Sequence, residues 1–157
     1  MDQKRKEQYI EKKQDPSLKL FVVLSKAYRS VFDQVAKDIK SHGLNTTDFA
    51  VMELLYHKGE QPLQKIGDRI LLASGSITYV VDKLEKKELV KRIPCPNDRR
   101  ITYASITEKG ETLLNDIFPA HWRQIEAIMD GLDEQEKLQT IQLLKQLGVY
   151  ADDLERN

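Results

Sequence analysis

The sequence predicts a mainly α-helical chain that carries one small β-hairpin. Apolar residues recur in steps of three and four over most of the chain, which is the spacing of amphipathic helices. The exception is a stretch in which two short runs rich in β-branched residues, 89–93 and 101–106, flank a loop of Pro, Asn and Asp. Two helices separated by a turn come directly before this hairpin, and that order is typical of a winged helix-turn-helix.

The first helix is expected to begin at Asp15-Pro16-Ser17, because proline suits a first helical turn and Asp or Ser can cap free amides. It should end at His42-Gly43, where glycine can provide a left-handed cap. Residues 1–15 have almost no apolar content, and we interpret them as a mobile N-terminal arm. The apolar stripe of the helix consists of Phe21, Leu24, Tyr28, Val31, Phe32, Val35 and Ile39.

Two shorter helices and a recognition helix are expected next. The first, 45–59, opens at an Asn cap and closes at a glycine. Gln61-Pro62 should then break the chain before a short helix over 63–71. Residues 73–75 form the turn, with Ser74 as the N-cap of the helix that follows. The buried stripe of that helix consists of Ile77, Val80, Val81 and Leu84.

The C-terminal third predicts two further helices. One begins at Thr107 to Gly110, and Pro119 should kink or break it before Gly131 ends it. Asp133 caps the last helix.

The long helices carry more apolar residues than a small winged-helix core can cover, so we expect a symmetric dimer. Residues 16–44 and 108–157 would form the helical dimerisation region, and 45–107 the winged helix-turn-helix lobe. A monomer that folds its ends into one bundle is the alternative.

Composition excludes several classes of protein. The 157 residues have a net charge of zero, yet residues 83–100 carry seven basic and three acidic side chains, whereas 108–157 carry eleven acidic and five basic. That asymmetry fits a protein with one face toward nucleic acid. No apolar run is long enough for a membrane span, and no apolar signal core is present, so we expect a cytoplasmic protein without a membrane partner. A single cysteine excludes an intramolecular disulfide.

Catalysis and metal binding find little support in the sequence. The three histidines, His42, His57 and His121, fall on different predicted helices without the paired spacing of metal ligands. Neither HExxH nor a P-loop nor GxGxxG occurs. We therefore expect no enzyme, no metal site and no cofactor.

Two motifs carry a resemblance to a known family. The segments VDKLEKKELVKR and NDRRITYASITEKG, at their spacing here, resemble the MarR family of bacterial transcription regulators over roughly residues 17–148. Within the family, the chain is most similar to the branch that responds to phenolic compounds, quinones or peroxides. Glu88 stands where the family usually has glycine, so we expect the recognition helix to end without a left-handed cap. Cys95 stands where the hairpin, or wing, commonly carries an acidic residue.

The resemblance implies a dimeric regulator that represses transcription by binding an inverted-repeat operator in double-stranded DNA. One wing arginine of the family enters the minor groove, a role we assign to Arg100, with Asp98 orienting its guanidinium and Arg99 on phosphate. Gln64 and Lys65 would reach phosphates. Solvated charges and capping residues are the plainer reading of the same side chains. The predicted contacts from the recognition helix are Ser74, Ser76, Thr78, Tyr79, Lys83 and Lys86.

Two kinds of signal could release such a regulator from DNA. In one, a small phenolic ligand binds between the dimer helices and the lobe, although the side chains concerned could equally be plain core. In the other, Cys95 is an oxidation or quinone sensor whose thiol pKa is lowered by Arg92, Arg99 and Arg100. A dimeric winged-helix adaptor that binds protein rather than DNA is the alternative function. The candidate ligand-contacting residues are Tyr28, Phe32, Tyr56, His57 and Trp122.

Overall fold

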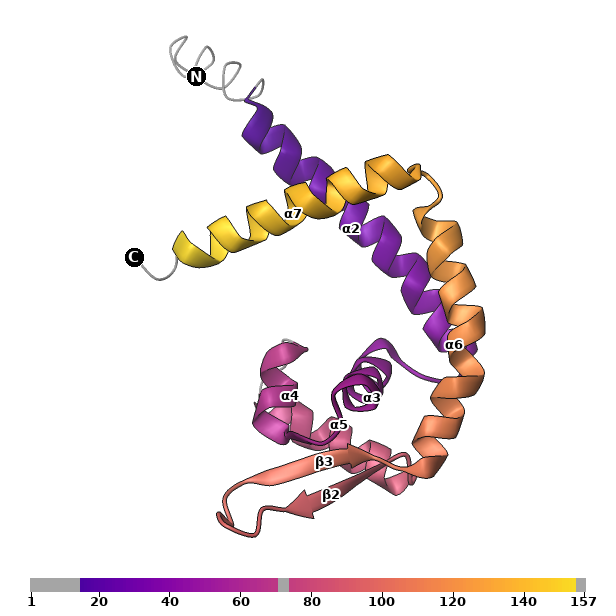
Figure 1. The fold of residues 1–157 in the computed structure, drawn as a ribbon, viewed down its shortest axis with the longest axis vertical. Helices are drawn as coiled ribbons and strands as arrows, with labels where there is room; N and C mark the ends of the chain where they lie inside the picture. The colour runs from indigo at the N-terminus through magenta and orange to yellow at the C-terminus, as the bar shows by residue number, and fades with distance from the viewer. Residues whose placement is uncertain (1–14, 71–73, 155–157) are drawn as a thin grey trace, which may run out of the picture. The chain divides into compact units, whose positions relative to one another are not determined.

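The computed structural model describes residues 15–70 and 74–154, which divide into two compact units, one ending at His121 and the other starting at Trp122. Residues 1–14 of the arm expected over 1–15 and residues 71–73 lie outside this description, as do the side chains of Ser74 and Gly75. The elements in chain order are α2 (Pro16–Ser41), α3 (Thr46–Lys58), β1 (Gln61–Pro62), α4 (Leu63–Arg69), α5 (Ser74–Lys86), β2 (Val90–Pro94), β3 (Thr102–Ile106), α6 (Glu108–Met129) and α7 (Glu134–Leu154) (Figure 1).

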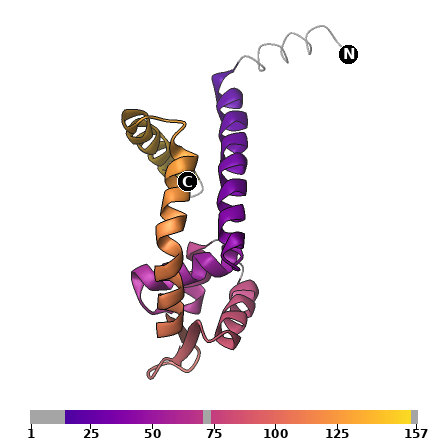
Figure 2. The ribbon, with the colours of Figure 1, turned by 90° about the vertical axis from the view of Figure 1, so that its right-hand side faces the viewer.

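The N-caps expected from the sequence are present at three helices, where each capping side chain bonds an amide only two or three residues away. The Asp15 side chain accepts a hydrogen bond from the Ser17 amide at 2.8 Å, and α2 runs without interruption for 26 residues (Figure 2). Asn45 caps α3 by accepting from the Asp48 amide at 2.7 Å. Asp133 caps α7 and forms a reciprocal capping box with Glu136, both hydrogen bonds being 2.9 Å.

The core of the first unit lies between α3, α4, α5 and the sheet. The expected stripe of α5 is buried, with every one of its four side chains at most 7% exposed. Leu114 and Ile117 of α6 complete this core, and Ile39 is the buried residue of α2. Because the N-terminal half of α2 contributes nothing buried, its apolar stripe remains exposed within this unit.

The sheet has one strand more than the sequence predicts. Gln61 and Pro62 do not merely break the chain but form β1, which pairs antiparallel with β3 opposite Ala104 and Tyr103. The strand order is β1-β3-β2, so β1 is an edge. Proline is tolerated there because an edge strand leaves one row of amides unpaired.

Two further expectations are corrected. Of the two outcomes expected at Pro119, a kink or a break, the break does not occur, because α6 continues from Glu108 to Met129 with the proline inside it. The recognition helix does end in a left-handed cap, because Glu88 itself adopts a φ of 62°. The amides of Glu88 and Leu89 bond to the carbonyls of Glu85 at 2.8 Å and Leu84 at 3.0 Å, which is the Schellman pattern.

The strained cap leads to a prediction about stability. Both Glu88→Gly and Glu88→Ala remove the exposed ion pair with Lys109, at 2.8 Å, but only glycine relieves the left-handed strain. We expect the glycine variant to be more stable than the alanine variant by about 1 kcal/mol. Urea unfolding of the two variants side by side measures this difference, and equal midpoints and slopes would contradict it.

The end of α5 and the start of α6 meet at one junction. The Thr107 hydroxyl donates to the Glu88 carbonyl at 2.6 Å and accepts from the Gly110 amide at 3.1 Å, while the Thr107 amide donates to the Leu89 carbonyl at 3.1 Å. A Cβ atom at Gly110 would lie 2.3 Å from the Leu89 oxygen and 2.8 Å from Cγ1 of Ile106. Glycine is therefore required where α6 passes over the start of β2.

The second unit contains the end of α6 and the whole of α7. The structure describes no buried residue in α7, although the helix carries a series of large apolar side chains. Those exposed by more than a third of their area are Leu138, Ile141, Leu143, Leu144, Leu147, Val149, Tyr150 and Leu154.

Candidate nucleic-acid interface

The recognition helix α5 buries one face and exposes a polar face. Ser76, Thr78, Tyr79 and Lys86 all lie on the exposed face, as predicted from their spacing against the buried stripe. Tyr79 is 68% exposed, which is unusual for an aromatic side chain and leaves its ring open to a partner. This exposed face presents hydroxyl, phenol and ammonium groups, which can hydrogen-bond to a polar partner.

A groove of about 790 Å³, which we call the wing groove, lies between α4, α5 and β3, beside the wing. Gln64 and Lys65 of α4, Thr78 of α5 and Arg100 of the wing all line it. Four side chains predicted separately from three segments are thus brought together by the fold. Thr102, which the sequence analysis did not single out, lines the same groove.

A second, more open groove brings the other side of α5 against the start of α3. It is lined by Ser76, Tyr79 and Lys83 together with Asn45 and Thr47. From the sequence, Asn45 was predicted only as a helix cap, and Thr47 was not among the predicted contacts. Their place at a helix N-terminus beside a basic helix could have drawn attention to them, because free amides there favour anions.

Lys83 has an internal partner that its sequence context did not reveal. Its Nζ lies 2.8 Å from Oδ2 of Asp48, a residue only 1% exposed, and the Lys87 Nζ is 3.9 Å from the same oxygen. A carboxylate buried to this extent requires a counter-charge. This ion pair therefore links α5 to α3, and the Lys83 ammonium is already engaged in that internal contact.

At the tip of the wing, Asp98 and Arg100 form the paired contact that the sequence analysis assigned to them. Nε and Nη2 of Arg100 donate to the two carboxylate oxygens at 3.1 and 3.0 Å, and the Arg100 amide donates at 2.9 Å. The side-chain and backbone hydrogen bonds from Arg100 hold the pKa of Asp98 below its ordinary value. Arg100 remains 90% exposed, so its guanidinium is oriented and still available to a partner.

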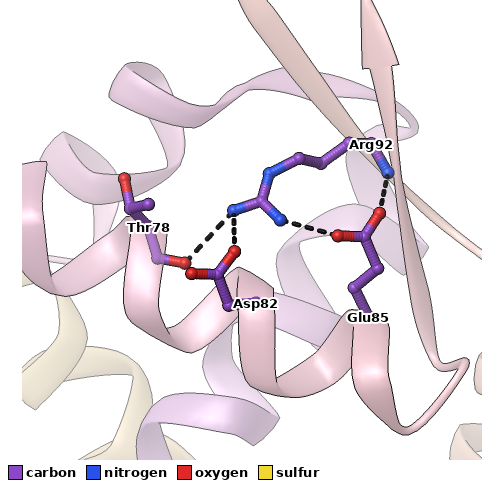
Figure 3. A network of polar contacts seen from close by, with 4 residues as sticks. All are labelled: Thr78, Asp82, Glu85 and Arg92. Atoms are coloured by element: carbon purple, nitrogen blue, oxygen red, sulfur yellow. Dashed lines mark hydrogen bonds and ion pairs between the residues drawn. The ribbon is translucent and has the colours of Figure 1, made fainter.

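Arg92 of β2 links the wing to α5 through several polar contacts, a role that was not predicted from the sequence. Its Nη2 lies 2.6 Å from Asp82 Oδ1 and 3.3 Å from the Thr78 carbonyl oxygen, and its Nη1 lies 2.6 Å from Glu85 Oε2 (Figure 3). The Arg92 amide also donates to Glu85, at 3.2 Å. Burial by itself lowers the pKa of Arg92, but the hydrogen bonds and charges of Glu85 and Asp82 outweigh it and raise that pKa.

The structure describes local contacts for the residues proposed to bind a small-molecule ligand. Tyr28 and Phe32 stack on α2 with ring centroids 5.6 Å apart. Tyr56 and His57 pack against Phe118, at 5.2 and 5.7 Å, and the Tyr56 hydroxyl donates to Asn115 at 2.7 Å. Trp122 belongs to the other unit, where it is 67% exposed.

Cys95 lies in the loop between β2 and β3, half-buried and free. Its amide donates to the Ile101 carbonyl at 3.1 Å, which closes the hairpin. Two of the three arginines that were expected to activate its thiol are paired elsewhere, Arg92 with Asp82 and Glu85, and Arg100 with Asp98. This reduces the support for a reactive thiolate, and a sensing role for Cys95 stays a prediction.

Residues 44–102, which contain α3 to β2 and the wing loop, match the MarR family. The "HTH-type transcriptional regulator MhqR" of Bacillus subtilis (strain 168) is 61% identical over 137 residues, covering 87% of this chain and 94% of that protein. The chain belongs to the MarR family. It is a helix-turn-helix transcriptional regulator, and this membership does not favour an adaptor that binds only protein.

Solved structures of MarR regulators share the fold at lower identity. AbsC of Streptomyces coelicolor is 19% identical with a TM-score of 0.81, covering 89% of this chain and 97% of that one. A mutant MarR of E. coli, complexed with operator DNA, is 17% identical with a TM-score of 0.75, covering 82% and 92%. These likenesses support the mainly helical fold with its small antiparallel sheet.

The family and the names of the relatives indicate a regulator and not an enzyme. Among the described residues, no three His, Cys, Asp or Glu side chains are grouped so that they could hold a metal ion. In the same part of the chain, no helix is both long and apolar enough to cross a membrane.

Proposed function

We propose that this protein is a dimeric, cytoplasmic repressor that binds an inverted-repeat operator and leaves it in response to a small aromatic or oxidative signal. The observation that carries the proposal is the wing groove, in which Gln64, Lys65, Thr78 and Arg100 surround one concave surface beside the exposed face of α5. The complex of a MarR mutant of E. coli with operator DNA, which shares this fold, supports a DNA partner.

Each predicted contact has a distinct role in the proposal. Arg100, oriented by Asp98, enters the minor groove, whose negative potential attracts a guanidinium. Arg99, Gln64 and Lys65 contact phosphates, which position the protein without reading sequence. The remaining contacts come from α5 and approach base edges or flanking phosphates in the major groove: Ser74, Ser76, Thr78, Tyr79, Lys83 and Lys86.

The dimer is supported by apolar surface that neither unit covers by itself. Phe21 and Tyr28 of α2 are 68% and 66% exposed, and α7 exposes a series of leucines. Large apolar side chains exposed in this number on a helix are typical of a protein interface. A second copy of this chain is the simplest partner, because two recognition helices then face two half-sites.

Two parts of the molecule are proposed as receptors for the signal. Tyr56 and His57 offer an aromatic wall and polar atoms to a phenolic ligand, with Tyr28, Phe32 and Trp122 as further candidates. Cys95 is the alternative receptor for an oxidant or a quinone.

The proposal is tested by fluorescence anisotropy of the purified protein on the duplex upstream of its own gene, against a shuffled duplex. Near physiological salt we expect tighter binding to the natural duplex by about 1000-fold or more, with two chains bound per site. Adding a simple phenol or quinone should release the protein. Equal affinity for both duplexes would contradict the choice of operator and, with it, the proposed function.

A further inference from the structure

Two acidic side chains occupy the exposed surface of α5. The carboxylates of Asp82 and Glu85 are 50% and 42% exposed, and Asp82 lies one helical turn after Thr78, which itself lines the wing groove. A carboxylate on a DNA-facing helix repels phosphates, and that repulsion grows as water is excluded from the interface. As isolated charges, these two side chains would oppose the proposed function.

Arg92 reaches both carboxylates from the neighbouring strand. Its two terminal nitrogens lie 2.6 Å from Asp82 and 2.6 Å from Glu85, and its side chain is only 23% exposed (Figure 3). A third contact, 3.3 Å from Nη2 to the Thr78 carbonyl oxygen, anchors the same guanidinium to the groove-lining turn of α5. The planar fork of arginine can hold two acceptors in this way, whereas the single ammonium of lysine cannot fix both at once.

We propose that Arg92 is a positioning residue for operator binding, which acts by masking the charges of Asp82 and Glu85 on the recognition helix. The side chain is turned toward α5 and engaged there, so it acts through the two carboxylates and not by touching DNA. This inference rests on the proposed function, because it presupposes that α5 approaches an operator.

The masking hypothesis is tested with four proteins: the wild type, Arg92→Met, the double variant Asp82→Asn/Glu85→Gln, and the triple variant that combines them. We expect Arg92→Met to weaken operator binding about 30-fold when the carboxylates are present. In the neutral background, the same substitution should cost less than about threefold. The triple variant contains no uncompensated charge, so it remains informative even where Arg92→Met alone fails to fold.

The salt dependence separates masking from a direct contact. Loss of a phosphate contact reduces the slope of log affinity against log salt by about 1. We expect no such reduction when Arg92 is replaced in the neutral background. A reduction of that size there, or equal losses of affinity in both backgrounds, would overturn the inference.

A matched control is available on the same strand. Lys91 is exposed next to Arg92, and the structure describes no ion pair for it. Lys91→Met should show the same fold-change in both backgrounds, because Lys91 does not act through Asp82 and Glu85. A wild-type protein with no operator preference would overturn the proposed function and this inference together, whereas wild-type preference without coupling would overturn the inference alone.

Discussion

Arg100→Ala is expected to weaken operator binding about 10- to 100-fold while it leaves the free energy of unfolding almost unchanged. The side chain is 90% exposed, and the hydrogen bonds that the structure describes for its guanidinium go to Asp98, so its removal creates no buried cavity. An oriented arginine in a minor groove contributes about 1–3 kcal/mol to binding. Anisotropy titrations on operator and shuffled duplexes, with urea unfolding of the same samples, measure both quantities.

Arg99→Ala is the matched control at the same tip. We expect it to weaken binding to both duplexes alike and to reduce the salt slope by about 1, as loss of a phosphate contact does. Operator affinity that is unchanged in Arg100→Ala, or that falls equally for both variants and both duplexes, would contradict the role given to Arg100.

The pair that orients Arg100 also has a defined pH dependence. Because hydrogen bonds from Arg100 lower the pKa of Asp98, the contact is complete above the ordinary pKa of an aspartate and is lost only as pH falls through the lowered value. Titration of Asp98 should therefore not affect operator binding between about pH 6 and 8.

Gly110→Ala is expected to lower the free energy of unfolding by about 2–3 kcal/mol. The added Cβ would lie 2.3 Å from the backbone oxygen of Leu89, which cannot turn away as a flexible side chain could. Alanine has a higher helix propensity than glycine, which stabilises the helix by about 1 kcal/mol. This gain is too small to offset the clash. Urea or thermal unfolding gives the value directly.

Gly131→Ala serves as the comparison, because a Cβ at that position meets nothing within 4 Å. It should leave stability unchanged or slightly raised. If the variant at Gly110 unfolded at the same urea concentration as the wild type, the close approach of α6 to Leu89 would be refuted.

The sequence predicted those features that depend on a few neighbouring residues. The caps at Asp15, Asn45 and Asp133 each bond an amide two or three positions away, so their residue types suffice. The buried stripe of α5 follows from spacing alone. The exposed polar face of that helix is then fixed by elimination.

Features set by distant partners could not be predicted in this way. Proline in Gln61-Pro62 indicates a break, and only the presence of β3 some forty residues later turns the pair into an edge strand. At Glu88, the absence of glycine suggested no left-handed cap. Tertiary bonds around the Glu88 carbonyl hold the strained conformation nonetheless.

The candidate site shows the same division. The sequence sufficed to predict which side chains of the site are exposed. It did not reveal which charged side chains pair with one another. Arg92 was placed beside Cys95 because the two are close in sequence, whereas its guanidinium contacts Asp82 and Glu85 on α5. Likewise, Lys83 reaches Asp48 from 35 residues away.

The junction at Thr107 has a mechanical consequence for the whole recognition lobe. The Thr107 hydroxyl is bonded both to the cap that ends α5 and to the first turn of α6, and at Gly110 the backbone of α6 lies directly against Leu89 at the start of β2. A hinge needs residues that can rotate freely, and none is available at this point. If the start of α6 tilts, the wing and α5 are therefore expected to move with it as one rigid body.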